Sequence, residues 1–265
     1  MNIFLKEMKS HRKSLILWSI GVFLMVASGM VKYESLSSSG QPMNEMLAGM
    51  PKSMLALLGI GDFDISTATG YYGLLFIYLL LMATIHAAML GATIIAKEER
   101  DKTSEFLFVK PVSRNRVITA KLLAAFVNIL IMNLVTFVTS LGLVGKYSNG
   151  EVVTKDIAIT MAGMFILQLL FMVIGSSLAA GRKKSKSAAS LATGVLLLTY
   201  VISVVIDLNE NIEGLKYLTP FKYFEAKNVM FGGGFEFIFV LLSGVLIAAL
   251  TLVTFLFYKK RDLNV

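Results

Sequence analysis

The chain has 265 residues, of which 56% are apolar and only 16% are charged. A soluble domain has about a quarter charged residues, because its surface faces water. We therefore expect lipid to cover much of this surface. The formal net charge of +8 would suggest a nucleic-acid partner if it lay on one soluble face. Here the basic residues lie between apolar stretches, so no nucleic-acid partner is expected.

Several kinds of chemistry are excluded by what the sequence lacks. It has no cysteine, which excludes disulfides, thiolate metal sites and a cysteine nucleophile. Two histidines are too few for a histidine-rich metal site. Gly145-Lys146 is followed by Tyr147 and has no upstream glycine at the spacing of a P-loop. We expect no metal or cofactor in this chain and no ATP bound by a P-loop.

Six stretches are long and apolar enough to cross a bilayer, which takes about 20 apolar residues in a helix. A basic run at 182–186 separates the fourth from the fifth, and it must be a loop because each basic residue costs about 2.5–3.5 kcal/mol at mid-bilayer. The expected fold class is an all-α membrane protein, a single transmembrane domain over residues 1–265. The predicted spans are 15–30, 71–95, 122–144, 157–180, 188–206 and 235–257.

The distribution of basic residues predicts the orientation. With the N-terminus inside, eighteen of the 25 lysines and arginines lie on the cytoplasmic side, as the positive-inside rule requires. Both termini are then cytoplasmic. A cleaved secretory signal ending at Val26-Ala27-Ser28 is the competing interpretation. Its apolar run is long for a signal, and cleavage would leave five spans with the new N-terminus outside.

Segments next to the spans also carry predictions. Phe4, Leu5 and Met8 share one helical face, which is compatible with a short helix in the cytoplasmic interface. The long outer segments 31–70 and 207–234 are expected to lie on or dip into the outer leaflet. The second is rich in aromatic residues, which either anchor it in the membrane or form an outer gate. Small-residue pairs predict close helix contacts: Gly175/Ala179, Ser190/Gly194 and Gly244/Ala248.

The most informative stretch is the predicted cytoplasmic loop at 96–116. A charged helix extension leaves the membrane, and a short amphipathic piece follows with Phe106, Leu107 and Val109 as its apolar residues. Pro111 cannot continue a helix, because it lacks the N–H and its ring clashes with the preceding turn. A short rigid helix between two spans would suit the transmission of a push from a soluble partner. By itself, the pattern also fits an ordinary structured loop.

This stretch resembles the signature of ABC-2-type permeases. The matching residues are Glu99, Thr103-Ser104-Glu105-Phe106-Leu107, Lys110-Pro111-Val112-Ser113-Arg114 and Lys121-Leu122. Further matches are Leu57-Leu58-Gly59-Ile60 and Tyr217-Leu218-Thr219-Pro220-Phe221. The resemblance covers essentially the whole chain. It is closest to bacterial permeases of peptide-antibiotic resistance, such as bacitracin-type exporters.

The resemblance implies a division of labour in a bacterial cell membrane. A separate cytoplasmic ATPase would bind ATP and Mg²⁺, and a second permease half, identical or paralogous, would complete the export pathway. The cargo would be amphipathic: a peptide antibiotic, a drug or a lipid-like molecule. Residues 103–109 would be the coupling helix that docks on the ATPase. The implied coupling residues are Glu98, Glu99, Thr103, Glu105, Phe106, Leu107, Pro111, Ser113 and Arg114.

Polar residues inside the spans are few. None of the predicted spans has an Asp, Glu, Lys or Arg well inside it, which argues against an ion-coupled carrier. The amides and hydroxyls that are present either hold helices together or line a conduit, with Asn133, Thr136 and Ser140 on one face. The candidate pathway-lining residues are His86, Asn128, Asn133, Thr136, Ser140 and Gln168.

Three other classes remain as alternatives. An intramembrane enzyme would need a nucleophile with a base, or a metal cluster, at bilayer depth, and neither HExxH nor GxSxG occurs. We therefore expect a permease subunit and no enzyme. An ion-coupled secondary carrier would work without any ATPase. A non-transporting membrane partner of a sensing complex would share the six spans, and a neighbouring gene for an ATPase would help to separate these possibilities.

Overall fold

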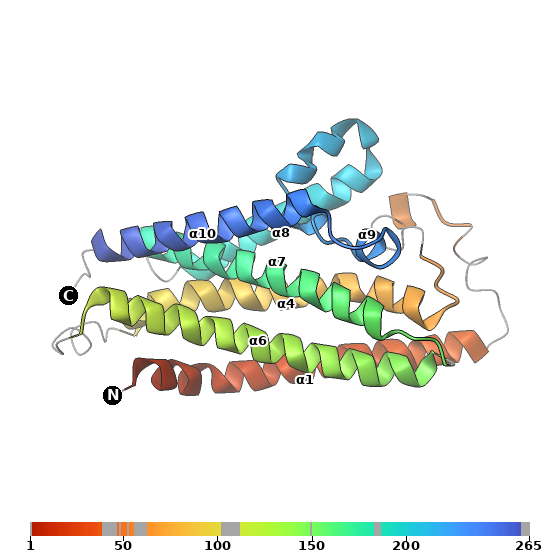
Figure 1. Ribbon diagram of the computed structural model, residues 1–265, viewed down its shortest axis with the longest axis horizontal. Coiled ribbons are helices and arrows are strands. Elements are labelled where there is room, and N and C mark those ends of the chain that lie inside the picture. The colour runs from red at the N-terminus through yellow and green to blue at the C-terminus, as the bar shows by residue number, and fades with distance from the viewer. Residues whose placement is uncertain are drawn as a thin grey trace.

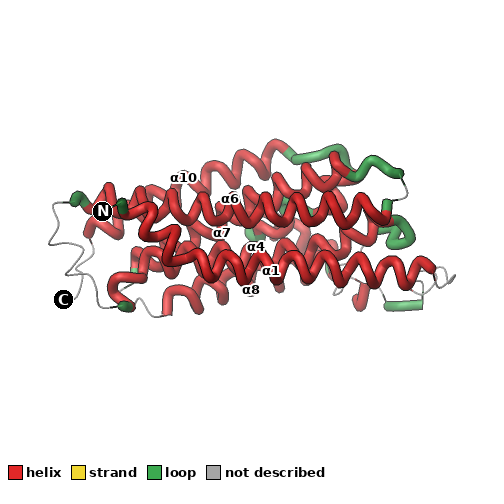
Figure 2. The backbone as a smooth tube through the Cα atoms, turned by 90° about the horizontal axis from the view of Figure 1, so that it is seen from below, coloured by secondary structure: helices red, strands yellow, loops and turns green. Residues whose placement is uncertain are grey.

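The computed structural model describes residues 2–38, 47, 49–51, 53–55, 63–101, 112–148, 150–182 and 187–260. Within these ranges the chain is helical and has no strand. Six helices are long and apolar enough to cross a membrane, and they run side by side (Figures 1 and 2). This confirms the predicted all-α membrane fold. The six are α1 (Ile3–Ser38), α4 (Ala68–Arg100), α6 (Arg114–Tyr147), α7 (Thr154–Gly181), α8 (Ala188–Leu208) and α10 (Phe237–Lys260).

One end of the bundle is formed by the starts of two helices and the ends of two others. The helices α1 and α6 start there, and α4 and α10 end there (Figure 1); we call it the terminal end. At 1.5 Å per residue, the 36 residues of α1 extend about 54 Å. A hydrocarbon core is only about 30 Å thick, so the helix reaches beyond it.

The first residues differ from the prediction of a separate helix in the interface. They form the start of α1, which is continuous from Ile3. Phe4 and Met8 pack against the core as predicted for an apolar face, but Leu5 is 59% exposed. The most buried side chain of this turn is Glu7, which is 1% exposed. A carboxylate therefore faces the other helices here, together with Phe4 and Met8.

The helices α4 and α7 form the centre of the bundle. In their most apolar stretches, 56% and 61% of the residues are buried, against 17–22% in α1, α8 and α10. Two glycines allow the backbones of α4 and α7 to touch. A methyl group on Gly91 would lie 2.1 Å from the Met172 carbonyl oxygen, and one on Gly175 would lie 2.3 Å from the Ala88 carbonyl oxygen. The prediction of a close helix contact at Gly175 is therefore confirmed.

Among the described residues, the glycines of the other two predicted pairs make no close helix contact. A methyl group on Gly194 of α8 or on Gly244 of α10 would meet no described atom within 4 Å. The outward faces of these two helices are instead apolar and exposed, as Leu198 and Leu252 show. Lipid or another protein must cover them, because water would leave this much apolar surface unfavourably solvated.

The segment between α8 and α10 contains η2 (Glu210–Tyr217), η3 (Pro220–Lys222) and α9 (Ala226–Phe231). Its aromatic residues divide into two groups. Phe221, Tyr223 and Phe224 are buried, and the Tyr223 ring stacks on Phe239 of α10 with centroids 4.9 Å apart. Tyr217 and Phe231 are 52% and 60% exposed. The predicted membrane anchoring by rings of this segment can therefore involve only the exposed pair, and it stays a prediction beside the outer gate. Most of the predicted apolar outer stretch at 43–58 lies outside the described residues.

Candidate coupling site at the terminal end

The predicted coupling loop connects α4 to α6. Thr103, Glu105, Phe106, Leu107 and Pro111 lie outside the described residues, so their predicted roles are carried forward untested. The remaining predicted coupling residues lie on its two flanks: Glu98 and Glu99 in the last turn of α4, and Ser113 and Arg114 at the start of α6.

Lys121 of α6 joins the two flanks of the loop. Its ammonium donates a hydrogen bond of 2.7 Å to Glu98 Oε2 and another of 2.5 Å to the Ile94 carbonyl oxygen, both on α4. The Lys121 side chain has no exposed surface. A cation near the C-terminus of α4 is also favourably placed toward the negative end of the helix dipole. The loop therefore starts and ends on two helices that a buried ion pair holds together.

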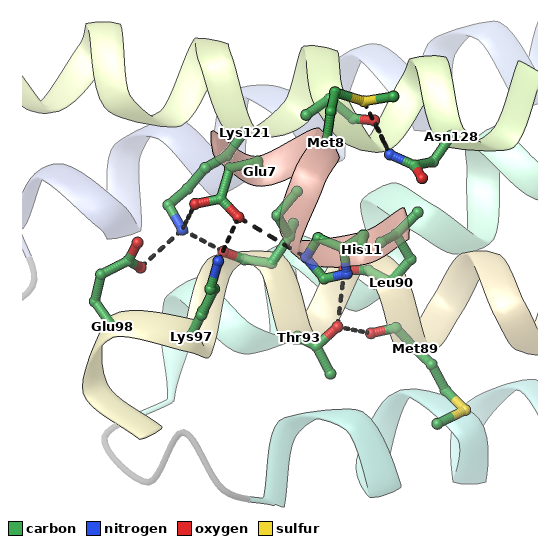
Figure 3. A network of polar contacts seen from close by, with 12 residues as sticks. Glu7, Met8, His11, Met89, Leu90, Thr93, Lys97, Glu98, Lys121 and Asn128 are labelled. Carbon is green, nitrogen blue, oxygen red and sulfur yellow. Dashed lines mark hydrogen bonds and ion pairs between the residues drawn. The ribbon is translucent and has the colours of Figure 1, made fainter. Parts of the chain in front are cut away.

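Glu7 adds α1 to the same cluster, as Figure 3 shows. Its Oε1 lies 3.7 Å from the Lys121 ammonium, and its Oε2 accepts a 3.1 Å hydrogen bond from Lys97 of α4. The His11 ring, one turn further along α1, has its Nε2 3.8 Å from the same carboxylate. Three helices that are far apart in the sequence thus meet at one carboxylate.

The balance of charge explains how these groups can be buried. Taking an ion out of water costs several kcal/mol, which only close partners and hydrogen bonds can offset. Glu7 and Glu98 provide two negative charges, while Lys97 and Lys121 provide two positive charges. Each member depends on the others, because removing one partner leaves an uncompensated buried charge. We call these four residues the charge cluster.

The two predicted coupling residues at the start of α6 have specific contacts. The Ser113 hydroxyl caps the helix by accepting a 3.4 Å hydrogen bond from the Arg116 N–H. Arg114 donates a 2.7 Å hydrogen bond from Nη1 to the Lys259 carbonyl oxygen, in the last turn of α10. Carbonyls in the last turn of a helix have no partner within the helix. Arg114 supplies one, and so attaches α10 to the same base as the loop.

The predicted pathway-lining residues of α6 and α7 lie inside the bundle. Asn133, Thr136 and Ser140 share a buried face of α6, as predicted. Asn133 Nδ2 donates 3.2 Å hydrogen bonds to Gln168 Oε1 and to the Met161 carbonyl oxygen, both on α7. Gln168 has no exposed surface. These amides connect helices here, which is the packing role that such residues commonly have.

The other members of the predicted set have separate surroundings. Asn128 Nδ2 donates to the Ala124 carbonyl oxygen at 2.7 Å and contacts Met8 Sδ at 3.1 Å (Figure 3). The Thr136 hydroxyl donates to the Met132 carbonyl oxygen of its own helix. His86 is 3% exposed, and its ring lies 5.4 Å from the Trp18 ring of α1. The structure therefore brings Asn133 and Gln168 together and keeps His86 apart from them.

Glu7 is the site residue that the sequence analysis missed. Its partners Lys97 and Lys121 are 90 and 114 positions away, beyond any local pattern. One signal was present: Glu7 is the single acidic residue before Glu34, in a stretch with five lysines and arginines. Among the described residues, no group of three or more His, Asp or Glu side chains is arranged to hold a metal ion.

The chain has six apolar helices of membrane-spanning length, and a buried ion pair joins two of them at the terminal end. These features define a multi-pass membrane protein. The chain belongs to the ABC-2 family transporter proteins, whose family profile matches residues 1–263. It is therefore a membrane permease subunit of an ABC transporter. No curated protein matches the sequence.

Proposed function

We propose that this permease exports an amphipathic molecule, driven by a separate ATPase that binds ATP and Mg²⁺ and docks on residues 103–109. The supporting observation is the charge cluster at the base of that segment. Lys121 and Glu98 connect the helices on its two sides, with a 2.7 Å hydrogen bond and no exposed surface on the lysine. A push on the segment then moves α4 and α6 together instead of bending one away from the other.

The same base extends the motion to two further helices. Glu7 connects α1 to the charge cluster, and Arg114 connects the end of α10 to the start of α6. An ATPase can drive transport only if it binds one permease conformation more tightly than another. Because these contacts connect α1, α4, α6 and α10, docking of the ATPase at one loop would move all four helices.

The proposed topology follows the basic residues. The terminal end faces the cytoplasm of a bacterium, so both termini are cytoplasmic and residues 1–265 form one transmembrane domain. A second permease half, identical or paralogous, completes the pathway. The exposed apolar faces of α8 and α10 leave room for such a contact.

The cargo class rests on the family and on the residues available. A peptide antibiotic, a drug or a lipid-like molecule would suit walls of aromatic, methionine and mildly polar side chains. An ion-coupled carrier is the alternative, but the ionic groups of the charge cluster lie within about two turns of the ends of their helices and not at the midplane where such carriers place them. A sensing partner without transport is the other alternative, and it would retain the ATPase.

The first test is co-purification with a candidate ATPase from mild detergent. Wild type is compared with a variant in which 103–109 is replaced by seven Gly and Ser residues. A matched control carries the same replacement at 40–46, in the connection between α1 and α4. We expect the ATPase to be lost only from the first variant, with both variants inserted normally.

Three outcomes would contradict the proposal. Equal retention of the ATPase by the 103–109 variant would place the docking surface elsewhere. Flux in liposomes from the permease alone, without ATPase or ATP, would favour the carrier. Retention of the ATPase without any ATP-driven flux would favour the sensing partner.

A further inference from the structure

A groove of about 250 Å³ lies between α1 and α4 at the terminal end of the bundle. Ser10, Ser14 and Trp18 line it from α1, at intervals of four residues that place them on one helical face. Both serines are exposed, so the groove is open along one side. None of the amides of α6 and α7 described above lines it.

The α4 wall of the groove changes in character along its length. Arg100 and Lys97 line its outer end, Thr93 lies one turn further in, and Met89 and His86 line its inner end. From residue 100 to residue 86 the helix rises about 21 Å. The groove therefore runs from cations, through hydroxyl groups, to apolar and aromatic side chains. Met89 is 38% exposed, so its inner part is not closed by protein.

Two imidazole nitrogens in the walls have no hydrogen-bond partner among the described residues: His86 Nδ1 and His11 Nε2. His86 is 3% exposed. Buried polar atoms are nearly always hydrogen-bonded, and an exception calls for an explanation such as a bound group that the protein alone does not show. His11 lies between Ser10 and Ser14 in α1, so a ligand with polar atoms at the level of these serines would supply a partner for its Nε2.

We propose that the groove binds an anionic phospholipid from the leaflet at the terminal end. The phosphate would lie near Arg100 and Lys97, the glycerol esters near Ser10 and Ser14, and an acyl chain along Trp18 and Met89. This order of groups matches the order of the walls. It rests on the membrane position of the chain and not on its proposed coupling to an ATPase.

The charge around the groove favours an anion. Lys97 is paired with Glu7, and Arg100 is paired with Asp101 through Nε at 3.0 Å, but the Arg100 side chain is still 47% exposed. The exposed face of α1 adds Lys9, Arg12 and Lys13 without a further acidic residue nearby in that helix. Each lysine or arginine near a membrane surface contributes about 1 kcal/mol of attraction to anionic lipids. A soluble phosphate could use the same cations. A lipid also fills the apolar inner half, which a free phosphate would leave empty.

The test is native mass spectrometry of the delipidated full chain, titrated with dioleoylphosphatidylglycerol or dioleoylphosphatidylcholine. We expect one phosphatidylglycerol to be retained on wild type and little phosphatidylcholine. Arg100→Gln should weaken retention about five-fold, as the loss of one nearby cation implies. Ser14→Phe, which fills the groove and keeps every charge, should weaken it at least about ten-fold, because the new ring occupies the lipid volume.

Matched controls separate the groove from general attraction. Arg12→Gln removes one cation that does not line the groove and should weaken phosphatidylglycerol retention less than Arg100→Gln does. Ser28→Phe adds a ring further along α1 and should retain phosphatidylglycerol like wild type. Equal weakening by Arg12→Gln, or equal retention of the two lipids, would overturn the proposal. Displacement of the lipid by millimolar inorganic phosphate would overturn it too, by assigning the site to a soluble anion. Thermal melting of each variant checks that folding is intact.

Discussion

The Lys121 ammonium and the Glu98 carboxylate, 23 residues apart in sequence, form a 2.7 Å ion pair between α6 and α4, with no exposed surface on the lysine and 11% on the glutamate side chain. The segment 102–111 connects the end of α4 to the start of α6, the two helices that this pair joins. The pair therefore fixes the separation of the two helices at the point where the segment 102–111 is attached.

Replacing Lys121 by Met should destabilise the protein by about 3–5 kcal/mol, the usual cost of removing one partner from a buried ion pair. The lost cation serves two carboxylates, those of Glu98 and Glu7. The measurement is thermal or denaturant unfolding in detergent, followed by the fluorescence of Trp18, the single tryptophan.

The control for this prediction is Lys13→Met, since Lys13 is exposed on α1. Adding Glu98→Gln to Lys121→Met should restore part of the lost stability, because it removes a carboxylate that has lost its cation. If Lys121→Met melts like Lys13→Met, the charge cluster does not hold the helices together.

Gly175→Ala should destabilise the bundle by about 1–3 kcal/mol, the range found for overpacking. The added methyl would lie 2.3 Å from the Ala88 carbonyl oxygen, a backbone atom that cannot rotate away. Gly194→Ala is the matched control, because a methyl there meets no described atom within 4 Å. Both changes raise helix propensity equally, so the difference in melting temperature reports the contact alone. Equal melting temperatures would contradict the close packing of α4 and α7.

Glu225, in the segment between α8 and α10, should make the stability of the protein depend on pH. Burial raises the pKa of Glu225 above its ordinary value of 4.5, an effect larger than the opposing influence of Lys222. The folded state therefore holds the proton more tightly than the unfolded state. The contribution of Glu225 to stability is fully present below pH 4.5 and is lost as the pH rises through its pKa in the folded state. Relative to Glu225→Gln, wild type should lose stability as the pH rises above 4.5.

Lys222 and Glu213, which lie in the same segment, provide comparisons for this experiment. Burial lowers the pKa of Lys222, but the carboxylates of Glu225 and Asp207 outweigh it and raise the pKa overall, so its contribution is lost only above pH 10.5. A hydrogen bond from Lys216 lowers the pKa of Glu213, whose contribution is lost as the pH falls. Glu213→Gln should therefore shift the pH profile in the opposite sense. A Glu225→Gln profile parallel to wild type would contradict the assignment.

The sequence predicted the parts of the fold that hydropathy alone decides. The six spans were recovered because lipid demands long apolar helices. The buried face with Asn133, Thr136 and Ser140 followed from helical spacing. Glu7 could not be found in this way, since its burial depends on lysines brought beside it by the packing of three helices. The face of Phe4, Leu5 and Met8 suggested a separate interfacial helix, because periodicity cannot show that the helix continues into α1.

The candidate site was predicted in part. Ser113 and Arg114 were assigned to coupling from a resemblance, and the structure gives them contacts within the chain, as the cap of α6 and the partner of the Lys259 carbonyl. A surface role toward the ATPase remains a prediction. The residues of 103–109 carry the docking hypothesis, and only the experiment on that segment addresses them.

The glycine contact between α4 and α7 limits how the molecule can move. Two helices whose backbones touch at Gly91 and Gly175 cannot slide along each other without a collision, so we expect them to travel as one strut through any transport cycle. Shape changes are then left to the peripheral helices, whose neighbours are lipid or another protein. A cross-link between α4 and α7 should leave transport unaffected, whereas one that fastens α8 to α7 should arrest it.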